Sequence, residues 1–215
     1  MKGRYFMICG LITASVFAIS LAYYGQLPER VPMHWGAHGE VNGWGSRAAF
    51  VVMTPAFMAG LLGIFAVLPW LSPKKFGVDR FETTYLYMML VVVGLLGYTQ
   101  LVMLYAALTH HIDVGKAITG GVCLLIALLG NVMGKVRRNF FVGTRTPWTL
   151  ADERVWDATH RFSAKLWTLG GLTALILSFV TRAPWVPMAI ILSLAVISIL
   201  YSLMFYKGLQ RRGQI

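Results

Sequence analysis

The chain has 215 residues, of which 57% are hydrophobic and only 13% are charged. A soluble domain carries about 25% charged residues, so this composition excludes an ordinary soluble fold. The formal net charge is +11, but the basic residues lie in short segments between long apolar blocks and form no basic domain or arm. This distribution is typical of residues that orient membrane spans and meet anionic headgroups, and we expect no direct binding of nucleic acid.

Six apolar blocks are predicted to cross the membrane, because a hydrocarbon core needs about 20 apolar residues. In chain order they are residues 5–24, 48–71, 83–108, 117–134, 166–181 and 187–206. The predicted fold is an all-α membrane protein in two parts, residues 1–72 with the first two spans and residues 73–215 with the other four. Lys2 and Arg4 before the first block also fit a cleaved signal peptide. The length of that block favours a retained span.

The distribution of Lys and Arg predicts the orientation. Only four of the 19 basic residues fall on one side of the predicted topology, namely Arg30, Arg47, Lys116 and Arg182. The others lie at the N-terminus, in the second and fourth loops and in the C-terminal tail. Because cytoplasmic loops carry an excess of Lys and Arg, both termini are predicted to lie in the cytoplasm.

The middles of the spans contain no Asp, Glu, Lys, Arg or His. Proton-coupled carriers and ion pumps need a group there that changes charge, so such a mechanism is disfavoured, while a permease or flippase for a neutral or amphipathic molecule stays open. Gln100 and Asn131 are interpreted as hydrogen-bonding between helices. A set of span glycines is predicted to allow close helix packing: Gly60, Gly63, Gly94, Gly97, Gly120, Gly121, Gly130 and Gly134.

The first outer loop, residues 27–45, is rich in proline, glycine and tryptophan. Proline fixes an extended entry and glycine permits tight turns, so we expect a structured extracytoplasmic cap, with its tryptophans packed inward or seated in the interface. His34, His38 and Glu40 are side chains that can bind zinc. Because the intervening glycines disfavour a helix that would align the histidines, we expect no metal and a hydrogen bond from a histidine to the loop backbone.

The fourth, cytoplasmic loop and the helix after it, residues 130–161, are the richest segment. Thr149 is predicted to cap a helix that reaches residue 181 and is too long for one crossing, so its first part should lie in the interface or bend away. An acid–base enzyme using Thr149 or Thr159 with His160 and Asp157 is conceivable, but no nucleophile elbow surrounds them. We therefore expect no enzyme, and keep a metal-assisted or acid–base membrane enzyme as an alternative.

Both loops resemble the SdpI family of bacterial membrane proteins. The outer loop resembles the motif LPxxVPxHW…G…(D/N)GW, although Asn42 stands where the family more commonly has Asp, which removes a possible carboxylate ligand. Its matching residues are Leu27-Pro28, Val31-Pro32, His34-Trp35, Gly39 and Asn42-Gly43-Trp44. The cytoplasmic segment resembles the motif GN…(K/R)xNxxxGxRTPWTL…VWxxTHR. Its matching residues are Gly130-Asn131, Arg138-Asn139, Gly143, Arg145-Thr146-Pro147-Trp148-Thr149-Leu150, Val155-Trp156 and Thr159-His160-Arg161.

This resemblance implies a six-span protein of the bacterial cytoplasmic (inner) membrane that needs no cofactor. It also implies resistance to a membrane-active toxin, signal reception, or both. The implied partners are the lipid bilayer, a secreted toxin peptide outside and a cytoplasmic regulator inside. The candidate binding residues are Asn131, Asn139, Arg145, Thr146, Trp148, Trp156, Thr159 and His160 inside, and His34 and Trp35 outside. The rigid guanidinium of Arg145 should have a fixed acceptor, such as helix-end carbonyls, Asp152, Glu153 or an anionic ligand.

Overall fold

The computed structural model describes residues 1–36, 40–109, 111–181 and 183–215. Within these residues, six helices are long and apolar enough to cross a membrane. They are α1 (Lys2–Ala22), α2 (Arg47–Leu71), α3 (Glu82–Thr109), α4 (Val114–Met133), α6 (Glu153–Val180) and α7 (Trp185–Arg211). Each of them contains most or all of one predicted span, so the all-α, six-span fold class is confirmed.

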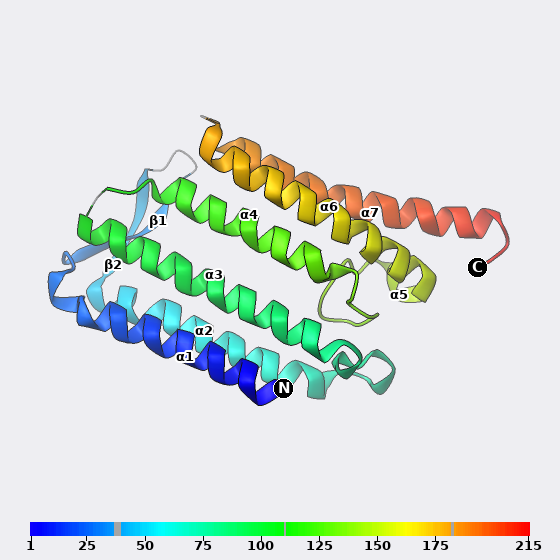
Figure 1. The fold of residues 1–215 in the computed structure, drawn as a ribbon, viewed down its shortest axis with the longest axis horizontal. Coiled ribbons are helices and arrows are strands. Elements are labelled where there is room, and N and C mark those ends of the chain that lie inside the picture. The colour runs from blue at the N-terminus through cyan, green and yellow to red at the C-terminus, as the bar shows by residue number, and fades with distance from the viewer. Residues whose placement is uncertain (37–39, 110, 182) are drawn as a thin grey trace.

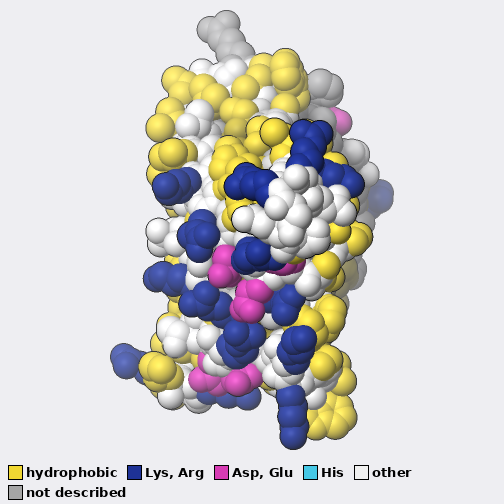
Figure 2. Space-filling model, turned by 90° about the vertical axis from the view of Figure 1, so that its right-hand side faces the viewer, with side chains coloured by type: hydrophobic (Ala, Val, Ile, Leu, Met, Phe, Trp, Pro, Cys, Tyr) yellow, Lys and Arg dark blue, Asp and Glu magenta, His cyan; other side chains and the backbone are white. Residues whose placement is uncertain are grey.

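Both ends of the chain lie toward one end of the helix bundle, here called the termini end, together with the short helix α5 (Pro147–Ala151) (Figure 1). The outer loop lies at the opposite end, called the hairpin end. Figure 2 faces the termini end and shows Lys, Arg, Asp and Glu side chains gathered there. The predicted placement of this end in the cytoplasm rests on the charge distribution and stays a prediction, as does the division at residues 72 and 73.

The closest helix contact in the bundle joins α4 to α6, and glycines create it. A Cβ atom on Gly130 would lie 2.5 Å from the backbone nitrogen of Thr168, and one on Gly171 would lie 2.6 Å from that of Ala127. Real Cβ atoms do not approach backbone this closely, so only glycine permits this distance between the helices. The predicted packing role of Gly130 is therefore confirmed.

Other span glycines divide into two groups. Gly97, Gly120, Gly121 and Gly134 each face a side chain of another helix, as predicted. By contrast, a Cβ atom on Gly60, Gly63 or Gly94 would meet nothing within 4 Å, so the packing role predicted for those three is wrong. The sequence marks a glycine as small but does not say whether its side of the helix faces protein or lipid.

One of the two polar span residues joins helices and the other does not. The buried amide nitrogen of Gln100 donates to the Ser20 hydroxyl at 3.3 Å and to the Phe50 carbonyl at 3.0 Å, and so connects α3 to α1 and α2. Asn131 is exposed and makes no hydrogen bond to any residue that the structure describes. The interhelical role is thus confirmed for Gln100 and wrong for Asn131, which lies on the outer side of α4.

The outer cap is a β-hairpin, built from β1 (Arg30–Trp35) and β2 (Val41–Ser46) after the 3-10 turn η1 (Tyr24–Gln26). Fully buried Val31 anchors it among Leu27, Phe50 and residues of α3. The tryptophans differ, because Trp35 packs inward while Trp44 is 51% exposed. Among the described residues, these two strands form the single sheet of a chain otherwise built from helices and loops.

The segment before α6 differs from its prediction. The 3-10 turns η2 (Lys74–Phe76) and η3 (Val78–Phe81) lie at this same end, and α5 precedes α6. Thr149 does not cap a helix, because Thr146 caps α5 and Asp152 caps α6 through a hydrogen bond from the Arg154 amide at 2.8 Å. The bend that was predicted within a long helix lies at Asp152, whose backbone is extended. Helix α6 then continues without a break for 28 residues, about 42 Å.

We predict the membrane orientation from the charges at the termini end. A reporter that fluoresces only in the cytoplasm should give signal when it is fused to either terminus or inserted between residues 137 and 145. The same reporter inserted in the hairpin should stay dark. Signal from the hairpin insertion would reverse the predicted orientation.

Replacing Gly130 with Val should weaken the bundle, because the new side chain must push α6 away from α4. Overpacking of this kind costs about 1–3 kcal/mol. The melting temperature of the purified protein in detergent should fall measurably. Gly60→Val is the matched control, since it adds the same side chain where nothing lies within 4 Å. Equal melting temperatures for the two variants would contradict the packing.

Candidate functional site

The loop between α4 and α5 is organised by the side chain of Asn139. Its oxygen accepts hydrogen bonds from the amides of Phe141 and Val142 at 2.7 and 2.8 Å. Its nitrogen donates to the carbonyls of Arg137 and Val142 at 2.8 and 3.0 Å. Asn139 is fully buried, and these four bonds use its amide group completely. It shapes the loop and offers nothing to a ligand.

His160 fastens the same loop to α6. Its Nε2 accepts the amide proton of Thr144 at 3.1 Å, so the ring is neutral and Nδ1 donates to the Trp156 carbonyl at 2.8 Å. The ring also stacks on Trp156, with centroids 4.0 Å apart. Gly143 has φ +108°, and a Cβ atom there would overlap the imidazole, so this position requires glycine.

The indole of Trp156 completes this junction. It is fully buried, and its N–H donates to the Val136 carbonyl at 2.8 Å. Trp148 is half-buried and donates to the Ser202 hydroxyl on α7 at 2.5 Å. Trp167 forms an equivalent bond with Ser198 at 3.0 Å. Trp148, Trp156 and Trp167 are therefore packed against their own chain.

Two threonines close the turn into α5. The Thr149 amide donates to the Thr146 hydroxyl at 3.3 Å, and the Thr146 amide donates to the Thr149 hydroxyl at 2.8 Å, which forms a capping box. Both side chains are buried. The hydroxyl of Thr149 also donates to backbone carbonyls of this turn, which explains why it does not cap a helix itself.

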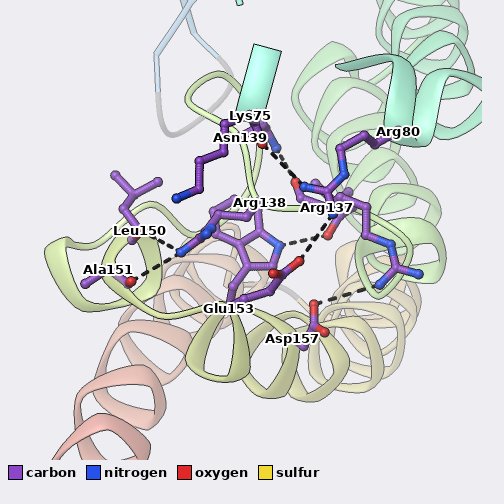
Figure 3. Close-up of polar contacts among 11 residues, drawn as sticks. Lys75, Arg80, Arg137, Arg138, Asn139, Leu150, Ala151, Glu153 and Asp157 are labelled. Atoms are coloured by element: carbon purple, nitrogen blue, oxygen red, sulfur yellow. Dashed lines mark hydrogen bonds and ion pairs between the residues drawn. The ribbon is translucent and has the colours of Figure 1, made fainter. Parts of the chain in front are cut away.

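Arginines at the termini end bind chain carbonyls and carboxylates. Arg145 is exposed and donates to the Phe140 carbonyl. Arg138 instead donates to the carbonyls of Leu150 and Ala151 at the end of α5, each at 3.2 Å (Figure 3). The predicted fixed acceptor of Arg145 is thus a loop carbonyl, and the helix-end carbonyls belong to Arg138. The guanidinium of Arg138 also lies over the Phe76 ring, 5.2 Å from its centroid.

Ion pairs at this end involve the acidic residues of the first turns of α6. Arg80 lies 3.4 Å from Glu153, and Arg137 lies 4.0 Å from Asp157. Both pairs are solvated and contribute about 0–1 kcal/mol each. Hydrogen bonds from the Arg154 guanidinium lower the pKa of the Asp152 carboxyl below its ordinary value. Asp152 therefore stays charged as the cap of α6.

The residues predicted to bind a partner at the termini end do not form an open site together. The Thr159 hydroxyl is completely buried, and Asn131 lies exposed on α4, away from the loop contacts. His160 cannot reach solvent as an acid or base, since it is buried and both ring nitrogens have partners. Among the loop residues that were predicted to bind a partner, Arg145 is both charged and exposed. The structure assigns the motif chiefly to folding.

The hairpin end contains a groove with a cavity volume of about 920 Å³. The first turns of α4 form its floor, α3 forms one wall, and the end of α6 with the start of α7 forms the other. The predicted residues His34 and Trp35 both lie on the part of the hairpin that covers it. The remaining lining includes Thr99, Met103, Asp113, Lys116, Thr119, Ser178, Trp185, Met188 and Leu192.

His34 bonds a side chain and not the loop backbone as predicted. Its Nδ1 lies 2.5 Å from the amide oxygen of Asn42 on the facing strand. The metal alternative needs His34, His38 and Glu40 together, and His38 lies outside the described residues. Within the part of the chain that the structure describes, no group of three or more metal-binding side chains comes together.

Sequence reasoning missed most of the groove. Asp113 carried a readable signal, since Asp is a preferred N-cap residue and an apolar block follows it. Trp185 marked a span end at the same level. Nothing in the sequence showed that these residues, Thr99 and the hairpin would meet, because that requires the packing of α3, α4 and α7.

The six spans, the hairpin and the folded termini-end loop define a multi-pass α-helical membrane protein, which its similarity to known proteins places in the bacterial inner membrane. Two family models match the chain, one described as the SdpI/YfhL protein family over residues 135–202 and one as a domain of unknown function, DUF1648, over residues 11–59. The chain is also 30% identical over 201 residues to the "Immunity protein SdpI" of Bacillus subtilis (strain 168), which covers 93% of this chain and 94% of that protein. No solved structure matches it. The chain belongs to the SdpI/YfhL family.

His160→Ala and Arg145→Ala should have different effects. The first removes a buried ring, its stack and two hydrogen bonds, and should cost about 2–5 kcal/mol. The second removes one exposed donor and should cost about 1 kcal/mol or less. Thermal unfolding in detergent measures both. A binding role for His160 without a structural one would leave its variant as stable as that of Arg145.

Proposed function

We propose that this protein confers resistance to a membrane-active toxin and does so without catalysis. One observation carries the proposal, namely the similarity to an immunity protein along almost the whole of both chains. It spans the hairpin and the termini-end loop together, so the relative has counterparts of both features. The relative is named as an immunity protein, and we extend that role to this chain.

The geometry supports a binding role in preference to a reaction. The one buried histidine of the motif has both ring nitrogens engaged within the chain, and the threonines nearest to it are buried. At the hairpin end the groove offers apolar walls and a few polar groups, as small-molecule sites commonly do. A secreted toxin would reach this end first in the predicted orientation.

A cytoplasmic regulator is the second proposed partner, and exposed Arg145 supports it. The guanidinium donates one bond to the Phe140 carbonyl and keeps further donors free. Exposed Lys74, Lys75 and Arg161 give the same end a positive surface. An acidic partner protein would complement that surface. This would be signal reception in addition to resistance.

Resistance can be tested in Bacillus subtilis cells that lack their own immunity protein SdpI. Such cells, carrying this chain or an empty vector, are grown beside the toxin-secreting parent strain. We expect cells with the chain to survive at a toxin dose that kills the vector control. Equal killing, with the protein present in the membrane, would contradict resistance to that toxin.

Two substitutions separate partner recognition from folding. Arg145→Lys keeps the charge but loses the planar fork of donors, so it should leave the amount of membrane protein unchanged. Loss of protection or signalling in this variant would place a partner at the termini end. His160→Ala should lose activity only in proportion to the lost protein. Full activity of Arg145→Lys would direct attention to the hairpin end.

A further inference from the structure

The groove at the hairpin end opens sideways, toward the space that lipid occupies. Its rim on α7 consists of Trp185, Met188 and Leu192, which are 69%, 40% and 62% exposed. Large apolar side chains with this exposure lie on the lipid-facing surface of a membrane span. A ligand can therefore enter the groove from the bilayer without crossing the hairpin.

The depth of the groove matches one leaflet. From Trp185 to Leu192 the α7 wall descends seven residues, about 10 Å. From Asp113 to Thr119 the floor on α4 descends six residues, about 9 Å. A leaflet contributes about half of a 30 Å hydrocarbon core. The groove thus reaches through most of one leaflet and stops before the middle.

Polarity changes from one end of the groove to the other. The carboxylate of Asp113 and the ammonium group of Lys116 lie at the start of α4, where the helix meets the membrane surface. They lie 3.8 Å apart, and their side chains are 56% and 48% exposed. Deeper in the groove, Met103, Ile118 and Leu192 are apolar. A ligand that complements the groove therefore has one charged end and a largely apolar remainder.

Hydroxyl groups lie at the same depth as the apolar side chains, since Thr119 follows Ile118 on α4 and Thr99 lies one turn beyond Met103 on α3. Ser178 donates to the Leu175 carbonyl, and Thr181 accepts from the Ala183 amide, so both are engaged within the chain. Thr119 makes no hydrogen bond to any described residue. It lies about 4.5 Å below Lys116 along the helix axis. Its hydroxyl can donate to an oxygen of a ligand whose anionic group contacts Lys116.

We propose that the groove is a binding site for one zwitterionic phospholipid, phosphatidylethanolamine, from the leaflet at the hairpin end. The lipid phosphate contacts Lys116 and its ammonium contacts Asp113, so the headgroup complements this pair in charge. An ester carbonyl of the lipid accepts from Thr119, and an acyl chain lies between α3 and α7. Trp35 and Trp185 flank the headgroup, where aromatic rings settle at the membrane surface.

A helical peptide fits these features less well. A peptide helix is about 10–12 Å across and advances 5.4 Å per turn, so less than two turns would fit along the groove. Its polar groups would repeat along its length, whereas the charged groups of the groove lie at one end. A lipid has that one-ended polarity and is present in the bilayer at high concentration.

Native mass spectrometry of the purified full chain tests the proposal with phosphatidylethanolamine and phosphatidylglycerol that carry identical acyl chains. We expect one tightly bound phosphatidylethanolamine and weaker phosphatidylglycerol. Thr119→Trp should abolish that bound lipid, because the indole occupies the space beside α4 that the ester carbonyl and the acyl chain of the lipid need. Leu11→Trp, at a 60% exposed position of α1, should leave it unchanged. Lys116→Gln should weaken binding about twofold to fivefold, as expected for an exposed charge contact.

Three results would overturn the proposal. The first is equal affinity for the two lipids, and the second is unchanged lipid binding by a folded Thr119→Trp protein. The third is uptake of a synthetic amphipathic helical peptide with no specific lipid, which would identify a peptide site. If Thr119→Trp does not fold, a phosphatidylethanolamine with a photoreactive acyl chain is used on the unaltered protein. It should label Met103, Met188 or Leu192, and labelling confined to α1 and α2 would overturn the site.

Discussion

The close approach of α4 and α6 is the constraint on which the termini end depends. Because Gly130 and Gly171 lack side chains, the two helices meet backbone against backbone at distances that no other residue permits. This contact fixes where the first turns of α6 rise beyond α4. Trp156 and His160 therefore lie directly beneath the loop that leaves α4, and the loop can bond to them.

The loop in turn supplies what these two residues need. Val136 offers its carbonyl to the Trp156 indole, and Thr144 offers its amide to His160. An indole N–H or an imidazole nitrogen buried without a partner would cost about 1–3 kcal/mol. The motif residues thus satisfy one another across a short stretch of chain. This mutual dependence explains a specific sequence pattern without assigning it chemistry.

The sequence predicted the spans well, because lipid contact requires about 20 apolar residues and few other structures do. It predicted poorly wherever the outcome depended on the facing element. Gly60 and Gly130 look alike in sequence, but only Gly130 faces a helix. The hairpin was missed because its strands contain glycine and proline, which β-propensity disfavours, and the pairing is held by Val31 packing on α2 and α3.

The candidate residues divided for a related physical reason. Asn139, Thr146, Trp156 and His160 were identified as unusual, and they are, but a polar residue can be unusual because it is buried and fully bonded. The sequence cannot distinguish that condition from an open binding site. Arg145 differs because its charge stays exposed, and His34 and Trp35 differ because they cover a cavity. Only the three-dimensional contacts made this distinction.

The two ends of the bundle consequently have different physical capacities. At the termini end the polar groups of the motif are mostly used in holding the chain together, so a ligand there would have to break existing bonds. At the hairpin end the groups that line the groove include hydroxyl and charged side chains that solvent or lipid can still reach. Binding is most favourable where the polar groups of the site have no bonds to break and where the ligand can bury apolar surface. Recognition of an amphipathic molecule is therefore favoured at the hairpin end, while Arg145 is the principal feature that could extend recognition to the other.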